Sequence, residues 1–512
     1  MRIGKGPATG ATPQAARPAK PIRAVSRPTR SRPSGGSFVG LDIGTQTIKA
    51  VEVKGAGNAL TVTALAMVNT PPGLIQGGMI VDPKALGAVV KNLCGKNGIR
   101  SGRVISAAAG ADAVVVRVIE VPKMTPAELA ETMKWEIERH IPFAANDVEL
   151  SYQPIDDPAT IAADSANPNM EVLLAVARRD MVSLHLDTLQ AAGLKPVAID
   201  IEALAVGRAL IDLNKHGLAT KNVVIVNIGA ALTEVGVFKS GLLRFPRIIP
   251  MAGDNITRAI SDGLGISMED AEDEKRQNAT VLMEMLGRGA VDADPFGDNI
   301  GTFSGGGGAP MRSPFDVPAM VAPPVFNAYV GTSEPEVTPP ILDVLPVTPT
   351  ANDPFAAASA FDPFGNPVGE AHAFDLGDDT DASGDPIGVV AAPPVPVRDD
   401  PQYRRQRDIF DAILPVLGEL SMEIHRSIDY FRSRYPTDTV DQIILCGGSA
   451  SLGNLDQYIQ QEMGVPTVVA NPFSGLNVTS KQFSPTALAA ISPAFAVAVG
   501  LAARDAILGT GG

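Results

Sequence analysis

The sequence predicts an α/β fold with an internal duplication, for three reasons. First, short strand-like runs alternate with segments of helical periodicity along most of the chain. Second, an apolar strand, a glycine turn and a second strand containing Thr or Val occur at 38–53 and again at 222–238. Third, the segments 1–37 and 281–400 depart from this pattern in composition. We therefore expect one duplicated α/β body with two appendages.

Composition agrees with a folded body of two or three domains. The 512 residues are 45% hydrophobic and 19% charged, which suffices for sizeable cores. The formal net charge of −14 is unevenly spread: 1–37 carries +8, 281–400 carries −15, and the remainder carries −7. A mildly acidic body lacks the basic patch of a folded nucleic-acid-binding domain. We therefore expect no nucleic-acid partner.

Both appendages are predicted to be disordered, because neither can bury enough apolar surface to offset chain entropy. Segment 1–37 is rich in Pro, Arg, Gly and Ser. A solvated tail, or a start codon placed too early, is favoured there over a basic arm for acidic lipid or protein. Segment 281–400 holds 18 of the 43 prolines and repeats Asp-Pro-Phe at Asp294, Asp353 and Asp362. These triplets are either docking motifs for a partner or incidental repeats in a spacer.

Cysteine content and hydropathy favour a cytoplasmic protein. Cys94 and Cys446 are too few for a disulfide framework or a cysteine-based zinc site, which favours a reducing compartment. The basic N-terminus lacks the apolar region of a signal peptide. The most apolar stretch, 493–508, is Ala-rich, interrupted by Arg504 and shorter than a spanning helix needs. Any membrane contact is therefore expected to come through a partner.

Each element of the body follows from a local pattern. Adjacent strands are expected at 37–53 and 61–68, and a second strand pair at 104–109 and 113–120, broken at Gly110. A capping box at 125–128 opens a helix that ends near Arg139. The remaining expected elements are helices at 83–93, 181–192 and about 403–432, and strands at 172–176, 222–238 and 443–446.

The first strand, turn and strand form a candidate phosphate-binding hairpin. Gly44 is expected to adopt positive φ, so that successive backbone N–H groups can point at one phosphate. The Thr45 and Thr47 hydroxyls would lie beside it. Asp42 at the strand end suits hydrated Mg²⁺, and Lys49 suits phosphate charge. The alternative is a tight hairpin with a polar turn.

Two further motifs strengthen this hypothesis. The stretch 226–234 repeats the strand, the glycine turn at Gly229 and a following Thr233, so that two hairpins would hold a triphosphate from two sides. The strand 443–446 ends in Gly447 and Gly448, which would let backbone approach a planar ligand. A simple glycine turn between strand and helix is the alternative there. Cys446 is expected to be a buried apolar residue without reactivity.

These motifs, with the apolar closing helix at 496–502, resemble the actin, Hsp70 and sugar-kinase ATPase superfamily. More narrowly, the chain resembles the PilM family of actin-like type IV pilus assembly proteins, and secondarily the FtsA family. The narrower resemblance is carried by the stretches 71–74, 81–83, 135–143 and 423–431. It implies actin-like duplicated RNase H-like domains with an extra small α+β subdomain. The implied bounds are 38–72 with 201–220 for the first half, 73–200 for the inserted subdomain, and 221–280 with 401–512 for the second half.

The resemblance also implies roles for individual residues around ATP and Mg²⁺. Asp42 would coordinate Mg²⁺ through water. The first phosphate loop would comprise Gly44, Thr45, Gln46, Thr47 and Lys49. The second phosphate loop would comprise Gly229, Ala231 and Thr233. Gly447, Gly448 and Ser449 would surround the adenosine, with Glu272 and Lys275 on its adenine and ribose side.

One position departs from the family pattern. The second loop usually begins with Asp, whereas this chain has Asn227. An amide lacks the charge with which a carboxylate holds a metal or activates water. Glu202 is then the remaining candidate to orient water, although an acidic residue on a helix is more often just solvated. We therefore expect ATP binding with weak or no hydrolysis.

The function implied by the resemblance is a cytoplasmic ATP-binding scaffold that binds the N-terminal peptide of the inner-membrane protein PilN. The helix 126–139 and the strand 114–118 would line the peptide groove or simply pack the subdomain. Contact with other pilus ATPases or platform proteins, and self-association, are left open. One alternative is a filament-forming cell-division or cytomotive ATPase like FtsA, although an amphipathic membrane helix is not expected at 508–512. A sugar or metabolite kinase has less support.

Overall fold

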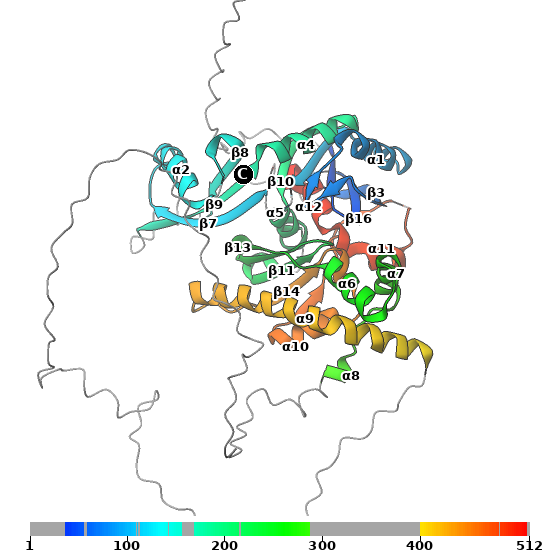
Figure 1. Ribbon diagram of the computed structural model, residues 1–512. Helices are drawn as coiled ribbons and strands as arrows, with labels where there is room; N and C mark the ends of the chain where they lie inside the picture. Colours follow the sequence, from blue (N-terminus) through cyan, green and yellow to red (C-terminus); the bar gives the residue numbers. More distant parts are fainter. Residues whose placement is uncertain are drawn as a thin grey trace, which may run out of the picture. The chain divides into compact units, whose positions relative to one another are not determined.

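The computed structural model describes residues 36–55, 59–108, 110, 113–141, 143–155, 168–213, 217–286, 400–480 and 482–508 (Figure 1). Residues 1–35 of the predicted disordered tail and the Asp-Pro-Phe triplets lie outside these residues, whereas Ser37, predicted to be part of the tail, begins the first strand. The predicted insertion begins too early at 281, because Val281 is fully buried in the core and Leu282 is 5% exposed. The isolated bridge between Thr280 and Gly453 holds this segment against the body.

The first half is built on a six-stranded sheet in the order β10-β6-β1-β2-β3-β16. Its strands are β1 (Ser37–Ile43), β2 (Thr47–Lys54), β3 (Thr61–Asn69), β6 (Arg103–Ala108), β10 (Lys195–Ile201) and β16 (Asn477–Val478). Strands β1 to β3 are antiparallel, whereas β6 runs parallel to β1. Helices α1 (Pro83–Lys96) and α4 (Arg179–Ala191) cover one face, and α5 (Glu202–Gly207) and α12 (Ala496–Leu508) cover the other. A small hairpin, β4 (Ile75–Gln76) with β5 (Met79–Ile80), precedes α1.

The second half repeats this plan with a five-stranded sheet in the order β13-β12-β11-β14-β15. Its strands are β11 (Asn222–Ile228), β12 (Thr233–Lys239), β13 (Leu242–Ile249), β14 (Gln442–Cys446) and β15 (Thr467–Val469). Here too an antiparallel hairpin, β11 with β12, has a parallel strand, β14, on its other side. This shared topology confirms the predicted duplication.

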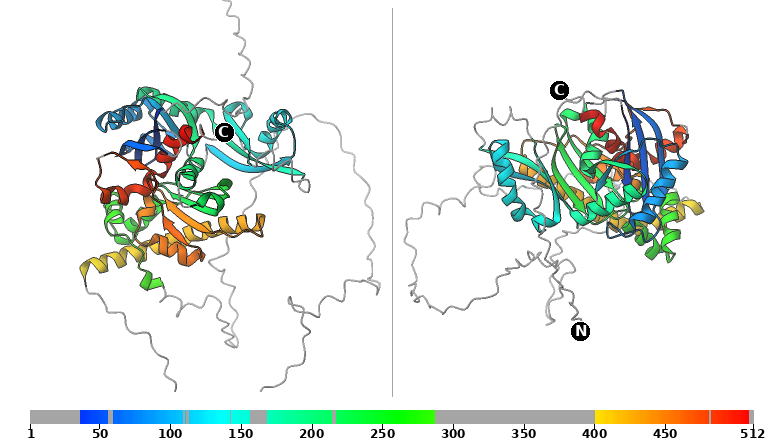
Figure 2. Two further views of the ribbon diagram at one scale, coloured as in Figure 1. Left: turned by 180° about the vertical axis from the view of Figure 1, so that it is seen from behind. Right: turned by 90° about the horizontal axis from the view of Figure 1, so that it is seen from above.

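Helices cover the second sheet on one face, and its other face joins the core beside α5 and α12. These helices are α6 (Gly253–Leu264), α7 (Met268–Asn278), α9 (Pro401–Arg434) and α10 (Leu455–Met463). The 34-residue α9 runs along this sheet (Figures 1 and 2). Its apolar residues recur at helical spacing, from Ile409 to Phe431, and are buried against the sheet. Short helices α8 (Met283–Leu286) and α11 (Pro485–Ile491) complete the described elements together with 3₁₀ and π turns.

A separate three-stranded sheet forms the compact part of the inserted segment. Its order is β7-β9-β8, with β7 (Val114–Pro122), β8 (Val148–Pro154) and β9 (Asn169–Arg178). Helix α2 (Pro126–His140) packs on it through Leu129 and Met133. The capping box predicted at its start is present, because Glu128 and Thr125 hydrogen-bond reciprocally. We call residues 114–178 the inserted subdomain from here on.

The assignment of strands to sheets differs from the expectation in one respect. β6 and β7 do not pair with each other: β6 lies between β1 and β10, and β7 pairs with β9. The reason is that β6 is buried along nearly its whole length, which suits a central parallel strand better than an edge hairpin. As a result, β6 and β10 from the segment 73–200 and β16 from the segment 401–512 belong to the first sheet, and α12 packs against it.

The apolar C-terminal stretch is longer than expected from the sequence. The helical run Pro485–Asp505 has the length and hydropathy of a membrane-crossing helix, and 61% of its most apolar window is buried inside the molecule. Within it, α12 packs between β1 and α5 and contributes Val497, Val499 and Leu501 to the core. Its apolar character is therefore explained by its place in the interior.

Candidate functional site

The first hairpin turn is closed by a hydrogen bond from the Gly44 N–H to the Thr47 carbonyl, at 3.1 Å. A Cβ on Gly44 would lie 2.9 Å from the same oxygen. The φ of Gly44 is not positive, so the expected reason for this glycine is wrong. Glycine is required because the turn leaves no room for a side chain.

The second hairpin has the same construction. The Gly229 N–H donates to the Leu232 carbonyl at 3.0 Å, and a Cβ on Gly229 would lie 2.8 Å from that oxygen. Register matches as well: Asp42 lies opposite Lys49 in the first hairpin, and Asn227 lies opposite Glu234 in the second. The two motifs are therefore structural equivalents.

Asp254, at the start of α6, joins the two hairpin turns. Its carboxylate accepts a hydrogen bond from Gln46 Nε2 at 2.9 Å, and its N–H donates to the Ala230 carbonyl at 2.7 Å. Gln46 in the first half and Ala230 in the second thus contact the same residue. The structure brings the two predicted phosphate loops together at Asp254.

The third motif, the turn after β14, lies against the second hairpin. Gly447 has φ 92°, and a Cβ there would lie 2.3 Å from the Ile228 carbonyl oxygen. The Ser449 hydroxyl donates to the Gly229 carbonyl at 2.9 Å, which also accepts the Gly253 N–H at 3.2 Å. Gly448 is exposed, with open space where its side chain would be. The backbone at Gly448 is therefore open to a ligand.

Glu272 and Lys275 of α7 lie against the start of α6. Lys275 Nζ donates to the Gly253 carbonyl at 3.1 Å and to the Thr257 hydroxyl at 2.8 Å. Its ion pair with Glu272 is 2.6 Å long. Burial raises the pKa of Glu272, but hydrogen bonds from Lys275, Thr257 and Arg276 and the charge of Lys275 outweigh it, so that the pKa lies below its ordinary value. Lys275 Nζ and Ser449 Oγ both lie next to Gly253, at 3.3 Å and 2.3 Å from where a Cβ on that glycine would be.

Four predicted threonine and alanine contacts differ in how accessible they are. Thr45 and Thr47 are partly exposed at the first turn, and Ala231 is exposed at the second. Thr233 is fully buried, and its hydroxyl donates to the Met251 carbonyl at 2.6 Å. The Thr233 hydroxyl therefore supports the segment before α6 and is not presented to the cleft.

Acidic side chains gather around Glu202 near the first hairpin. Asp42 forms a buried ion pair with Lys49 at 3.0 Å. Burial, with smaller contributions from Asp42 and Glu234, raises the pKa of Glu202 well above its ordinary value. Burial also raises the pKa of Glu234 to about 7, against a hydrogen bond from the Ala203 backbone. Glu202 thus lies near Asp42, Glu234 and Lys49, and its burial favours the protonated form.

Two residues of this site were missed by the sequence interpretation. Glu234 has one carboxylate oxygen, Oε2, that is buried without a hydrogen-bond partner among the described residues. Its signal was the spacing: Glu234 follows Asn227 by as many residues as Lys49 follows Asp42. Asp254 had the weaker signal of an acidic residue in the first turn of a helix, where the helix dipole favours it.

Cys446 is fully buried at the end of β14, as expected. Burial raises the pKa of its thiol, with smaller contributions from Glu234 and Glu202. Both observations agree with an unreactive packing residue.

Comparison with known proteins agrees with this architecture. The family model of the type IV pilus assembly protein PilM matches residues 40–281 and 407–506, which is more than half of the chain. A solved PilM-PilN type IV pilus biogenesis complex is similar with a TM-score of 0.60 and 24% identity, covering 93% of this chain and 99% of that chain.

The cell division protein FtsA is more distantly similar. The FtsA of Bacillus subtilis is 33% identical over 108 residues, which is 21% of this chain and 24% of that protein. The FtsA of Pseudomonas aeruginosa is 26% identical over 276 residues, which is 50% of this chain and 64% of that protein. The chain thus spans less than two thirds of either relative. The family match over both repeated halves, with their actin-like duplicated fold, means that the chain belongs to the PilM family of type IV pilus assembly proteins.

Proposed function

We propose that this chain is an ATP-binding scaffold of type IV pilus assembly that holds MgATP between its two halves and binds the N-terminal peptide of PilN. The observation that carries the nucleotide part is the contact of both hairpin turns with Asp254. Two tight glycine turns on one cleft offer backbone N–H groups to a single polyphosphate from opposite sides.

The charged groups of the site suit a nucleotide together with its metal. Asp42 and Lys49 form an ion pair with each other, so Lys49 is not an unpaired cation for a bare triphosphate. Bound Mg²⁺ would offset the charge of the phosphate oxygens. Among the described residues no group of three or more His, Cys, Asp or Glu could hold a metal by itself. Asp42 would therefore hold the ion through water, as is usual for Mg²⁺ bound with a phosphate ligand.

Calorimetric titration with MgATP tests the nucleotide proposal. We expect Asp42→Asn to weaken binding by about tenfold or more, because the hydrogen bond to hydrated Mg²⁺ loses its charge, a change of roughly 1.4 kcal/mol. The matched control is Asp180→Asn, whose exposed carboxylate pairs with Arg178 far along the chain from either hairpin. Equal affinities for wild type and Asp42→Asn, or no binding by wild type, would contradict the proposal.

Hydrolysis is proposed to be weak or absent. The amide of Asn227 occupies the position where the family usually has a carboxylate. The Oδ1 of Asn227 lies close to Gly447, 2.8 Å from where a Cβ on that glycine would be. Burial raises the pKa values of Glu202 and Glu234, which favours the protonated carboxyl over the carboxylate, and a protonated carboxyl cannot accept a proton from water. Phosphate-release assays should show no sustained turnover, and many turnovers per protein molecule would refute this part.

Partner binding is proposed from the family and from the solved PilM-PilN complex. In this proposal the protein works in the cytoplasm and reaches the inner membrane only through its partner. A fluorescent peptide from the PilN N-terminus should bind the full chain, and a scrambled peptide of the same composition should not. Equal binding of both peptides would contradict a specific PilN site.

A second candidate function is an FtsA-like filament, favoured by the FtsA similarity over half of the chain. Sedimentation with MgATP separates the two. Pelleting that depends on nucleotide would favour the filament, and a monodisperse supernatant would favour the scaffold.

A further inference from the structure

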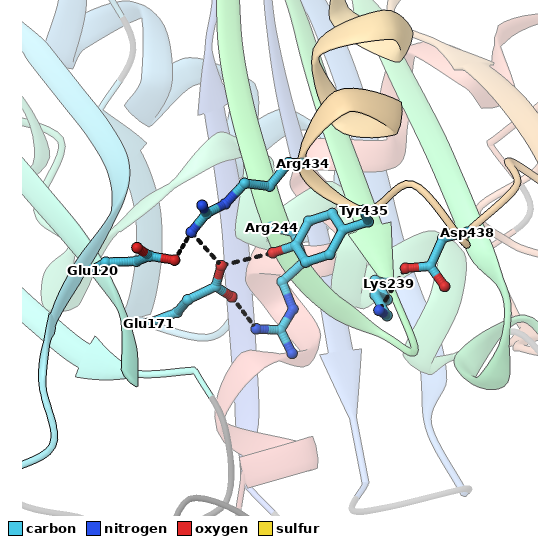
Figure 3. A network of polar contacts seen from close by, with 7 residues as sticks. All are labelled: Glu120, Glu171, Lys239, Arg244, Arg434, Tyr435 and Asp438. Carbon is cyan, nitrogen blue, oxygen red and sulfur yellow. Dashed lines mark hydrogen bonds and ion pairs between the residues drawn. The ribbon is translucent and has the colours of Figure 1, made fainter. Parts of the chain in front are cut away.

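The inserted subdomain contacts the second half of the body directly, away from the two hairpin turns. β7 of the subdomain lies beside β13, the edge strand of the second sheet. Charged side chains from both sides meet at this contact (Figure 3). The proposed nucleotide site uses none of them.

Two glutamates of the subdomain face each other at this contact. Glu120 on β7 and Glu171 on β9 are direct cross-strand partners. Like charges opposite each other on antiparallel strands destabilise the pairing. The subdomain therefore carries an unfavourable anionic pair unless cations from outside lie next to it.

The second half supplies those cations. Arg434, the last residue of α9, pairs with Glu120 and lies 3.5 Å from Glu171. Arg244 of β13 pairs with Glu171, and their side chains are only 11% and 14% exposed. The Tyr435 hydroxyl donates to Glu171 Oε1 at 2.7 Å. We call Glu120, Glu171, Arg244, Arg434 and Tyr435 the subdomain clamp.

The second-half side of the clamp is held in place independently of the subdomain. The Tyr435 N–H donates to the Phe431 carbonyl at 2.9 Å, which closes α9. Lys239 Nζ lies 4.7 Å from the centre of the Tyr435 ring, a cation–π contact, and pairs with Asp438 (Figure 3). The hydroxyl and both guanidinium groups are therefore presented on an ordered surface.

The two arginines of the clamp belong to β13 and α9, and both elements extend to helix α6 beside the proposed nucleotide site. β13 carries Arg244 and continues through Met251 into Gly253, where α6 begins. α9 carries Arg434 and packs along α6. Near its other end, Arg405 pairs with Glu274 of α7 at 2.7 Å. The same packed elements, β13 and α9, therefore connect the clamp to the helices beside the proposed nucleotide site.

From this arrangement, and resting on the proposed function, we propose that the subdomain clamp couples the inserted subdomain to the nucleotide cleft. The subdomain is continuous in sequence with the first half through β6 and α4, whereas the clamp holds it to the second half. Opening the cleft moves the halves apart and breaks the clamp. Conversely, a partner peptide that pulls the subdomain off the second half favours the open cleft.

A distance measurement between spin labels on the two halves tests this coupling in the full chain. The labels replace Lys84 on α1 and Glu269 on α7, both exposed, while the native Cys94 and Cys446 are buried. The test variant is Glu171→Gln. The matched control is Glu149→Gln, which removes the same charge from an exposed pair with Arg179 that does not involve the second half.

Without nucleotide, we expect wild type and Glu149→Gln to give the same narrow distance distribution. Glu171→Gln should give a longer mean distance and a broader distribution. Identical distributions for Glu171→Gln and Glu149→Gln would overturn the proposal. If Glu171→Gln fails to fold, Tyr435→Phe replaces it, because that change removes only the hydroxyl that donates to Glu171.

A second arm of the experiment separates this proposal from the nucleotide proposal. Saturating MgATP should return the Glu171→Gln distribution toward that of wild type, because a ligand held by both halves favours closure. Suppose that the distance distribution of Glu171→Gln differs from that of Glu149→Gln, and that MgATP changes neither distribution. The role of the clamp is then supported, and the proposed nucleotide function is contradicted. If MgATP binds and closes wild type but the two variants behave alike, the clamp fails and the nucleotide proposal stands.

Discussion

Glu234 lies in an environment that differs strongly from that of an ordinary surface glutamate. It lies opposite Asn227 in the second hairpin, and its Oε2 is buried without a hydrogen-bond partner in the described part of the chain. Burial raises its pKa to about 7. A carboxyl group in this position costs folding free energy whenever it ionises.

The replacement Glu234→Gln tests this cost. The pKa of Glu234 is about 7 in the folded state, and its ordinary value is 4.5. Between these two pH values the folded protein keeps a proton that the unfolded chain has released, so the free energy of unfolding falls as pH rises through about 7. Relative to wild type, the variant should gain up to about 3 kcal/mol at pH 8 and little at pH 4.5. Urea unfolding at both pH values measures the difference, with Glu149→Gln as control. An effect that does not change with pH would contradict the raised pKa.

The two cysteines give a second prediction at this scale. Burial raises the pKa of Cys94 to about 11, with a smaller contribution from Glu52, and Cys446 is fully buried. Both thiols should therefore be protonated and inaccessible at pH 8. Iodoacetamide should leave the native protein unmodified and alkylate two sites in urea, as mass spectrometry would report. Rapid alkylation of native protein would show that one of these cores opens readily.

Among the elements, α12 is the one most tightly fitted. A Cβ on Gly40 of β1 would lie 1.9 Å from the Ala498 carbonyl oxygen, and one on Gly500 would lie 1.8 Å from that of Ala205. Two glycines therefore let α12 approach β1 and α5 at backbone distance. The burial of Val497, Val499 and Leu501 depends on this approach.

A pair of glycine replacements tests the fit of α12. Gly500→Ala should destabilise the fold by about 2 kcal/mol or more, because the added methyl group overlaps backbone that cannot move alone. Gly418→Ala in α9 meets nothing within 4 Å and should stabilise by about 0.5–1 kcal/mol through helix propensity. Chemical denaturation of both variants measures the contrast. Equal effects would mean that α12 is not closely packed.

Elements set by local sequence were predictable, and contacts between distant segments were not. The two hairpins and α2 follow from strand alternation, glycine turns and a capping box, and the structure has all of them. The separation of β6 from β7 depends on which strand lies beside β1, which no local pattern reveals.

The same holds for the site. The hairpin residues were identified from the repeated motif, because both copies keep the same spacing. Asp254 was missed since its role arises only when α6 places it between the two turns. The subdomain clamp was missed for the same reason: Glu171 and Tyr435 are 264 positions apart.

For the whole molecule, the proposed function depends on the relation between the two halves. The chain crosses between them more than once: α12 and β16 follow the second sheet in sequence but pack in the first half. Gln46, Asp254 and Ala230 connect the halves at the cleft. A ligand that contacts both hairpins would therefore fix their relative position, and the protein would report nucleotide occupancy to whatever binds its surface.

Hydrogen exchange of the full chain with and without MgATP tests this central claim most directly. Peptides that contain the turns at 43–48 and at 228–233 should both become protected, together with those at 253–254 and 447–449, while a distant peptide such as 148–154 should change little. Protection of one hairpin alone, or of neither while MgATP is saturating, would contradict a single site shared by the two halves.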